Sequence, residues 1–300
     1  TSIIRMGNDL TCPKGCGKLN EHCQKQCGKK VTMTKFNELA ISPEILRAVE
    51  EMGYEEATAI QASAIPAIME GHDVLGLSNT GTGKTAAFGI PAIEKIHEYC
   101  KDPKVLIICP TRELVEQVAT ELRKFSKYKE GIKIAPVYGG QPIERQIQLL
   151  KRGCAIVVGT PGRLMDHLRR HTLRFTNCEQ VILDEADEML NMGFKEDIEE
   201  ILKSFPAQTH PQTILFSATM PDAILKITKQ FQNDPVQVKI KSVQRTIDTV
   251  DQYYYEVPRG KKTNALRVLL DRYDPELCMI FCNTKSMVDE LAAELNAHSM

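Results

Sequence analysis

Short apolar runs alternate with longer amphipathic segments along most of the chain. The short runs are rich in Val and Ile and are apolar almost throughout, as expected for strands buried on both faces. They occupy 73–77, 104–109, 132–137, 154–159, 180–184 and 212–217. The segments between them follow a helical period, and within 112–125 the residues Leu114, Val118 and Leu122 share one face. The pattern predicts an α/β fold, a doubly wound parallel sheet with helices on both sides.

The alternation weakens after Asp234-Pro235 and resumes near residue 249. We therefore expect a first domain at 33–235, a linker at 236–248 and a second domain at 249–300. In the second domain the pattern predicts strands at 251–257 and 277–282 and helices at 261–273 and 286–296. Two β-α units cannot bury a parallel sheet on both faces, so we expect the second domain to be truncated.

Composition excludes some classes of protein. Hydrophobic residues make up 42% of the chain and charged residues 26%, which is typical of an ordinary globular protein. The net charge of −1 provides no global basic field, so any contact with a nucleic acid must come from local amides and a few Arg or Lys side chains. No apolar run approaches the ~20 residues needed to span a bilayer, which predicts no membrane partner.

The ten cysteines fall into two groups. Six are scattered, several of them in apolar runs (Cys109, Cys278 and Cys282), which indicates reduced thiols and a cytoplasmic location. The other four could in principle ligate zinc, with His22 nearby; they are Cys12, Cys16, Cys23 and Cys27. Zinc knuckles favour closer pairs with a longer loop between them, and the segment is rich in Lys, Gly and Asn. We therefore expect residues 1–32 to be a disordered tail without a zinc site.

The segment SNTGTGKT at 78–85 lies between a predicted strand and a predicted helix. This is the context of a phosphate-binding loop, although Ser78 stands where the usual pattern has glycine. Gly81 and Gly83 let backbone amides turn toward a phosphate, and the helix N-terminus adds partial positive charge. Lys84 would contact the β and γ phosphates and Thr85 would offer an oxygen to Mg²⁺. The alternative is a plain glycine-rich turn.

Acidic residues follow the apolar run at 180–183. A buried strand that delivers Asp184 to its carboxyl end suits Mg²⁺, which prefers oxygen ligands and retains water. Glu185 would then orient and deprotonate an attacking water. The alternative is an acidic helix start favoured by the helix dipole. The upstream phosphate loop favours the metal-binding interpretation.

The combination of D-E-A-D at 184–187 with T-G-T-G-K-T resembles the DEAD-box family of ATP-dependent RNA helicases, most closely its bacterial members. Other family motifs follow in order: PTREL at 110–114, Gly139-Gly140, TPGRL at 160–164 and SAT at 217–219. The segment GYEEATAIQ at 53–61 resembles the adenine-reading motif of the family. The resemblance covers about 33–300 and implies a RecA-like first domain followed by an incomplete second RecA-like domain.

The resemblance also implies roles for the matched residues. The residues expected to bind ATP are Phe36, Tyr54, Gln61, Thr80, Gly81, Thr82, Gly83, Lys84 and Thr85, with Gln61 reading adenine and Tyr54 or Phe36 packing against it. Asp187 would couple the nucleotide to RNA through Ser217 and Thr219. The residues expected to bind RNA are Pro110, Thr111, Arg112, Gly139, Gly140, Thr160, Gly162 and Arg163. Contacts of this kind reach sugar and phosphate and so predict binding that is independent of sequence. Each could instead serve only helix capping or a turn.

The resemblance implies an ATP-dependent RNA helicase that uses ATP and Mg²⁺ to unwind RNA locally in the full-length protein. One alternative stays open, an RNA clamp gated by nucleotide that never unwinds. Another P-loop ATPase, for example one acting on DNA, is disfavoured by Gln61 together with D-E-A-D and S-A-T. The family's H-R-x-G-R-x-G-R motif does not occur in these residues. Because an arginine finger contributes about 10³- to 10⁵-fold to turnover, we expect this chain to bind ATP·Mg²⁺, hydrolyse it feebly and not unwind RNA. Protein partners and the RNA substrate are left undetermined.

Overall fold

The computed structural model describes residues 4–5, 34–79, 81–97, 99–206, 209–239, 252–253, 255, 257–258 and 260–297. The chain divides into two compact units, Lys29–Ser242 and a second formed by Thr1–Gly28 with Val243–Met300. Each unit is described by itself.

The larger unit is built on a seven-stranded parallel sheet in the described residues, with strand order β4-β5-β3-β6-β7-β2-β8. The strands are β2 (Val74–Leu77), β3 (Val105–Ile108), β4 (Ile134–Val137), β5 (Ile156–Gly159), β6 (Gln180–Leu183), β7 (Gln212–Ser217) and β8 (Val236–Lys239). The first six coincide with the six apolar runs, so the predicted doubly wound sheet is confirmed. All the ladders are parallel, so the carboxyl ends of the strands meet at one edge.

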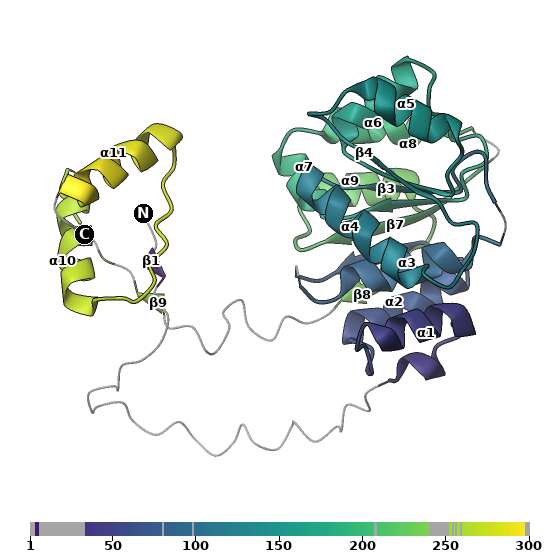
Figure 1. Cartoon of the computed structure of the whole chain (residues 1–300), viewed down its shortest axis with the longest axis horizontal. Helices are drawn as coiled ribbons and strands as arrows, with labels where there is room; N and C mark the ends of the chain where they lie inside the picture. The colour runs from purple at the N-terminus through teal and green to yellow at the C-terminus, as the bar shows by residue number, and fades with distance from the viewer. Residues whose placement is uncertain are drawn as a thin grey trace. The chain divides into compact units, whose positions relative to one another are not determined.

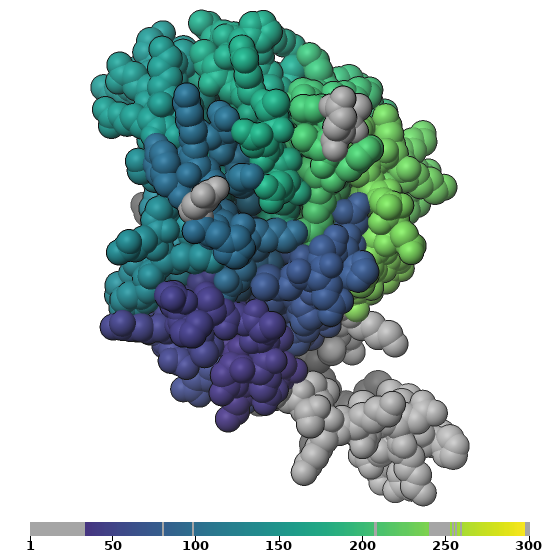
Figure 2. Space-filling view, turned by 90° about the vertical axis from the view of Figure 1, so that its right-hand side faces the viewer, coloured from purple at the N-terminus to yellow at the C-terminus, as the bar shows by residue number. Residues whose placement is uncertain are grey.

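The linker expected at 236–248 is wrong over its first part, because residues 236–239 form strand β8. Residues Val236–Lys239 pair in parallel with β2, with Val74 opposite Val236, and so extend the sheet into the range 236–248. The polar pattern of this strand reflects an edge position, because only Val238 of its four residues is buried. Figure 2 shows the surface of this last part of the unit beside that of the α2 region, in agreement with the β2–β8 pairing.

Helices cover both faces of the sheet (Figure 1). They are α1 (Pro43–Glu51), α2 (Ala59–Met69), α3 (Lys84–Glu94), α4 (Arg112–Phe125), α5 (Ile143–Lys151), α6 (Pro161–Arg169), α7 (Ala186–Asn191), α8 (Lys195–Lys203) and α9 (Asp222–Phe231). Side chains alternate between faces along each strand. Ile107 therefore joins the core under α1 to α4, whereas Leu106 and Ile108 join the core under α5 to α9.

The second unit contains a short antiparallel pair, β1 (Ile4–Arg5) with β9 (Gln252–Tyr253), and the helices α10 (Lys262–Tyr273) and α11 (Lys285–Ala297). Both helices match the predicted segments. The rest of the segment 1–32, including its four cysteines, lies outside the described residues.

The strand predicted at 277–282 is wrong. These residues are irregular, and Leu277, Met279 and Phe281 are 92%, 70% and 80% exposed. A strand exists only where a neighbour accepts and donates its backbone hydrogen bonds, and no described strand lies beside this segment. Cys278 is consequently exposed and Cys282 half-buried, whereas Cys109 is buried as expected.

Candidate functional site

The candidate site lies at the carboxyl edge of the sheet in the larger unit. The loop at 78–83 follows β2, the acidic residues follow β6, and Ser217 ends β7. These strands are neighbours in the order β6-β7-β2, although the sequence separates them widely. The fold therefore brings the predicted phosphate loop, the acidic motif and the SAT motif to one place.

Two glycines shape the phosphate loop. Gly81 has φ +83° and Gly83 has φ +88°, a left-handed conformation that residues with a Cβ rarely adopt. At Gly83 a Cβ would also fall 2.3 Å from Nε2 of Gln61. Gly83 is the N-cap of α3, so the free amides of the helix start at this loop and suit a phosphate.

Ser78 supports the loop instead of obstructing it. Its Oγ hydrogen-bonds with Oγ1 of Thr82 at 2.9 Å, and Thr82 Oγ1 in turn donates to the carbonyl of Asn79 at 2.9 Å. The Ser78 hydroxyl therefore stabilises the turn through a hydrogen bond that a glycine at this position could not make. Thr80, also expected to bind nucleotide, lies outside the described residues.

Lys84 and Asp184 form a buried pair beneath the loop. Nζ of Lys84 lies 3.9 Å from Oδ1 of Asp184, and neither atom has a hydrogen-bond partner among the described residues. Burial raises the pKa of Asp184 to about 6, and Lys84 offsets part of that rise. Buried charges without hydrogen bonds are costly. The pair is therefore arranged for a ligand that can satisfy both atoms.

Glu185 follows in a left-handed conformation, with φ +53°. A residue with a side chain in this region costs on the order of 1–3 kcal/mol, and such strain is concentrated at functional sites. The conformation ends β6 and places Glu185 at the N-cap of α7, half-buried beside Asp184. Thr85, the other predicted magnesium ligand, is half-buried in the first turn of α3.

Asp187 is bound to the SAT motif. Its Oδ2 accepts hydrogen bonds from the amide of Thr219 at 2.9 Å and from Thr219 Oγ1 at 2.8 Å. Oγ of Ser217 donates to the carbonyl of Thr219 at 2.6 Å and so shapes the same turn. Burial works to raise the pKa of Asp187, but the hydrogen bonds from Thr219 and its neighbours outweigh it, and the pKa is lowered.

Of the residues expected around adenine, Gln61 contacts the loop directly. Gln61 is buried, its Oε1 accepts from the amide of Thr58 at 2.8 Å, and its Nε2 donates to the carbonyl of Gly83 at 3.1 Å. Phe36 is 2% exposed and stacks on Tyr54, with the ring centroids 6.1 Å apart. Tyr54 is 36% exposed, so of the two aromatic rings it is the one available to a base.

A second group of residues, called here the loop cluster, follows β3, β4 and β5. It consists of the residues expected to bind RNA: Pro110, Thr111, Arg112, Gly139, Gly140, Thr160, Gly162 and Arg163. Thr111 caps α4 by accepting from the amide of Leu114, and the Arg112 guanidinium lies 5.0 Å from the centre of the Tyr138 ring. Gly140 has φ +83°, and a Cβ there would lie 3.8 Å from Nη1 of Arg112.

Thr160 and Gly162 occupy the start of α6. Thr160 is the N-cap, Pro161 is the first helical residue, and Gly162 is exposed. Strands β4, β5 and β3 are adjacent, so the structure brings all three parts of the loop cluster to one end of the sheet. Arg163 differs from the expectation, because its guanidinium turns inward toward the carbonyl of Gln141.

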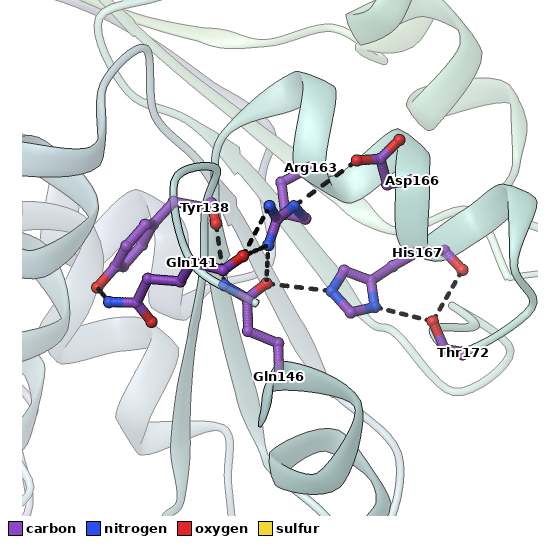
Figure 3. A network of polar contacts seen from close by, with 7 residues as sticks. All are labelled: Tyr138, Gln141, Gln146, Arg163, Asp166, His167 and Thr172. Atoms are coloured by element: carbon purple, nitrogen blue, oxygen red, sulfur yellow. Dashed lines mark hydrogen bonds and ion pairs between the residues drawn. The ribbon is translucent and has the colours of Figure 1, made fainter. Parts of the chain in front are cut away.

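Sequence reasoning missed Gln146, which accepts a hydrogen bond from Arg163, and His167, which hydrogen-bonds to Gln146 (Figure 3). A signal existed: each is a polar residue on the apolar face of its helix. Gln146 lies four residues before the buried Leu150, and His167 three residues after the buried Leu164.

No group of three or more His, Cys, Asp or Glu side chains in the described part of the chain is arranged to hold a metal ion. Mg²⁺ usually keeps several waters and takes only one or two carboxylates, so Asp184 with Thr85 still fits it. Within the same residues no helix has the length and apolar character of a membrane span.

A parallel sheet with a phosphate loop after one strand and an acidic residue after a nearby strand defines the RecA-like class of P-loop proteins. A family model described as DEAD/DEAH box helicase matches residues 58–227. The chain therefore belongs to the DEAD/DEAH box helicase family.

Individual relatives agree with this assignment. The chain is 52% identical over 264 residues to the DEAD-box ATP-dependent RNA helicase CshA of Bacillus cereus, covering 88% of this chain and 50% of the relative. It is 49% identical over 261 residues to CshA of Bacillus subtilis, covering 87% and 52%. The chain thus spans about half the length of the curated relatives it matches.

Among solved structures, a DEAD box protein of Methanococcus jannaschii is similar, with a TM-score of 0.67 and 42% identity over 88% of this chain and 70% of that one. A hypothetical ATP-dependent RNA helicase of Sulfolobus tokodaii has a TM-score of 0.60 and 39% identity, covering 66% and 57%.

Proposed function

We propose that this chain is the nucleotide-binding part of an ATP-dependent RNA helicase, which binds ATP with Mg²⁺ at the phosphate loop and the RNA backbone at the loop cluster. The observation that carries the proposal is the buried pair of Lys84 and Asp184, unsatisfied by hydrogen bonds beneath a left-handed glycine loop. The names of the Bacillus relatives support it. The buried free thiols, such as Cys109, support a cytoplasmic location.

The nucleotide is bound by groups of distinct chemistry. Amides at the start of α3 and Nζ of Lys84 hold the β and γ phosphates, since both supply positive charge. The exposed ring of Tyr54 packs on the base and is supported from behind by Phe36. Gln61 reads the base edge through its amide, which already contacts the loop at Gly83 and so links base and phosphate recognition.

Thr85 and Asp184 hold Mg²⁺, which when bound neutralises phosphate charge. With a pKa of about 6, Asp184 is ionised at neutral pH and can serve as a ligand. Glu185, fixed by the left-handed turn, orients the attacking water and accepts its proton. Asp187 connects these residues to Thr219 and so couples the nucleotide site to RNA binding.

RNA is bound through its backbone. The loop cluster offers amides at Gly139 and Gly140, the amides at the N-terminus of α6, and the guanidinium of Arg112. These groups recognise phosphate and sugar, not base edges, so binding is independent of sequence. Discrimination of RNA from DNA depends on contacts to the 2′-hydroxyl.

The nucleotide part is tested by titrating a fluorescent ATP analogue into the chain with Mg²⁺ and with EDTA. Lys84→Ala should weaken binding at least about tenfold, because a charge-assisted contact to phosphate contributes more than 1.4 kcal/mol. Lys127→Ala is the matched control, since Lys127 is an exposed lysine paired with Glu51. Equal affinity of the wild type and Lys84→Ala would refute the site.

The RNA part is tested by anisotropy with a short labelled oligouridylate, competed by unlabelled RNA and by DNA of matched sequence. Binding that RNA competes more strongly than DNA supports the proposal. Unwinding requires a separate duplex assay with the full-length protein. Binding of RNA without unwinding in that assay would identify a nucleotide-gated clamp instead.

A further inference from the structure

A buried polar network lies beneath the turn that carries Gly139 and Gly140. It links the end of β4, α5 and α6 through Tyr138, Gln141, Gln146, Arg163, Asp166, His167 and Thr172 (Figure 3). Neither Gln146 nor His167 belongs to the residues that the family motifs single out. Burial of the Gln146 and His167 side chains costs free energy that apolar side chains in the same space would not, so their polar groups are expected to have a role.

Arg163 connects the network to the turn. Its Nη1 donates to the carbonyl of Gln141 at 3.0 Å and to Oε1 of Gln146 at 3.1 Å, and its Nη2 donates to the same Gln141 carbonyl at 3.1 Å. Nε lies 3.6 Å from Oδ2 of Asp166, and the side chain is only 12% exposed. The guanidinium thus clamps one end of the turn.

Gln146 holds the other end. Its Nε2 donates to the carbonyl of Tyr138 at 2.9 Å, which fixes the orientation of the amide. Oε1 must therefore face Arg163 and His167 and accept from both. Gln146, which is 4% exposed, thus connects the two ends of the turn. It binds the carbonyl of Tyr138 before the glycine pair, and it also binds Arg163, which holds the carbonyl of Gln141 after the pair.

His167 fixes Gln146 in turn. Its Nε2 lies 3.2 Å from the Gln146 oxygen, which can only accept, so the proton of the neutral ring is on Nε2. Nδ1 then accepts from the hydroxyl of Thr172 at 2.8 Å. The ring is fully buried, and burial together with Arg163 lowers its pKa to about 4, so it is neutral at physiological pH.

The turn itself faces solvent. Gly139 and Gly140 are exposed, and among the described residues neither of their amides donates to a protein acceptor. A Cβ at Gly139 would meet nothing within 4 Å. The carbonyls of Tyr138 and Gln141, on either side of the glycines, are both held by hydrogen bonds from the network. The two glycine amides therefore remain available to a ligand that accepts hydrogen bonds, such as a phosphate oxygen.

We propose that Gln146 and His167 are positioning residues for RNA: through Arg163 and the Tyr138 carbonyl they hold the Gly139–Gln141 turn in the conformation that presents its amides to the RNA backbone. This inference rests on the proposed RNA binding by the loop cluster. Neither residue touches RNA, so their replacement affects RNA affinity only through the shape of the turn.

The test uses the whole chain with Gln146→Leu, His167→Leu and His167→Gln. Leucine keeps the volume and removes the hydrogen bonds, whereas glutamine places an amide N–H near the position of Nε2. RNA affinity is measured by anisotropy with the labelled oligouridylate, and nucleotide affinity with the fluorescent ATP analogue. The ¹⁵N relaxation order parameters of the amides at 139–141 report the rigidity of the turn without RNA, and Thr172→Val is a milder variant should His167→Leu fold poorly.

Both leucine variants should weaken RNA binding about three- to tenfold, as expected for the loss of one or two hydrogen bonds. The order parameters at 139–141 should fall, His167→Gln should restore RNA affinity to within about twofold of the wild type, and ATP-analogue affinity should not change. Thr172→Val should show a smaller loss.

Three results would count against the inference. Unchanged RNA affinity and unchanged order parameters in the leucine variants would overturn it while leaving the proposed function intact. A parallel loss of ATP-analogue binding would overturn it by revealing a general structural role. If the wild type binds no RNA, the proposed function itself is wrong, whatever the order parameters at the turn show.

Discussion

Nζ of Lys84 and Oδ1 of Asp184 face each other at 3.9 Å, and neither makes a hydrogen bond within the described residues. The two residues come from the start of α3 and the end of β6, which β7 and β2 bring close in the sheet. A pair held at this distance is stabilised by attraction but lacks the hydrogen bonds that normally offset burial. A phosphate at Lys84 and a hydrated cation at Asp184 would supply them.

Alanine at the two loop glycines should have unequal effects. Both positions have positive φ, which costs a residue with a Cβ about 1–2 kcal/mol. Gly83→Ala additionally forces Cβ to 2.3 Å from Nε2 of the buried Gln61, whereas at Gly81 nothing lies within 4 Å. Gly83→Ala should therefore lower the free energy of unfolding by about 2–4 kcal/mol and Gly81→Ala by about 1 kcal/mol. Urea unfolding without nucleotide measures both; equal losses would contradict the contact with Gln61.

Thr219→Val should raise the pKa of Asp187 toward its ordinary value. The substitution removes the hydroxyl that donates to Oδ2 and keeps the backbone amide that also donates there. Because the folded pKa is lowered, the stabilisation by Asp187 is present above its unfolded pKa of about 4 and is lost as pH falls through the folded value. Carbon-13 NMR titration of the carboxyl group checks the shift. An unchanged pKa would show that the hydroxyl does not contribute.

His167 should make the protein less stable in mild acid. Its pKa is about 4 when folded and about 6.5 when unfolded, because burial and Arg163 disfavour the charged ring and Asp166 only partly compensates. As pH falls, His167 therefore takes up a proton in the unfolded chain before it does so in the folded protein. The free energy of unfolding should fall as pH drops from about 6.5 to 4, by at most about 3 kcal/mol from this group.

Urea unfolding of the wild type and His167→Gln at pH 7 and pH 5 measures that dependence. The wild type should lose about 2 kcal/mol more than the variant between these values. His171→Gln, at a nearby exposed histidine, is the matched control and should behave as the wild type does. Identical pH profiles for all three proteins would show that His167 is not buried as a neutral ring.

Arg112→Ala should reduce the salt dependence of RNA binding. A cation that neutralises one phosphate of a single strand contributes about 0.7 to the slope of log K against log salt concentration. Arg123→Ala is the control, because Arg123 is exposed in the last turn of the same helix, away from the loop cluster. The slope should fall by about 0.7 for Arg112→Ala and stay constant for Arg123→Ala. Equal slopes for the wild type and Arg112→Ala would show that Arg112 does not contact an RNA phosphate.

ATP hydrolysis by the chain should be slow and only weakly stimulated by RNA. The 300 residues contain no H-R-x-G-R-x-G-R motif, and an arginine finger contributes about 10³- to 10⁵-fold to turnover. A coupled phosphate-release assay with saturating oligouridylate measures the rate, with Lys84→Ala as the background. Fast RNA-stimulated turnover that Lys84→Ala abolishes would contradict this prediction.

The sequence alone determined the strands and which polar residues stand at their ends. Strands β2 to β7 are buried on both faces, and a continuous apolar run is a local signal that needs no knowledge of neighbours. The phosphate loop and Asp184-Glu185 were predicted for the same reason, because each directly follows such a run. Sequence failed at 236–239, where an edge strand is polar, and at 277–282, where an apolar run has no described strand to pair with.

Tertiary structure decided which polar groups meet. Nothing in the local pattern places Gln61 against Gly83, or Arg163 against the carbonyl of Gln141 instead of toward solvent. These contacts depend on the strand order β4-β5-β3-β6-β7-β2-β8, which follows from how the two helical layers pack and not from any single segment. Apolar burial is specified residue by residue, whereas the partner of a buried hydrogen-bonding group is specified only when distant segments come together.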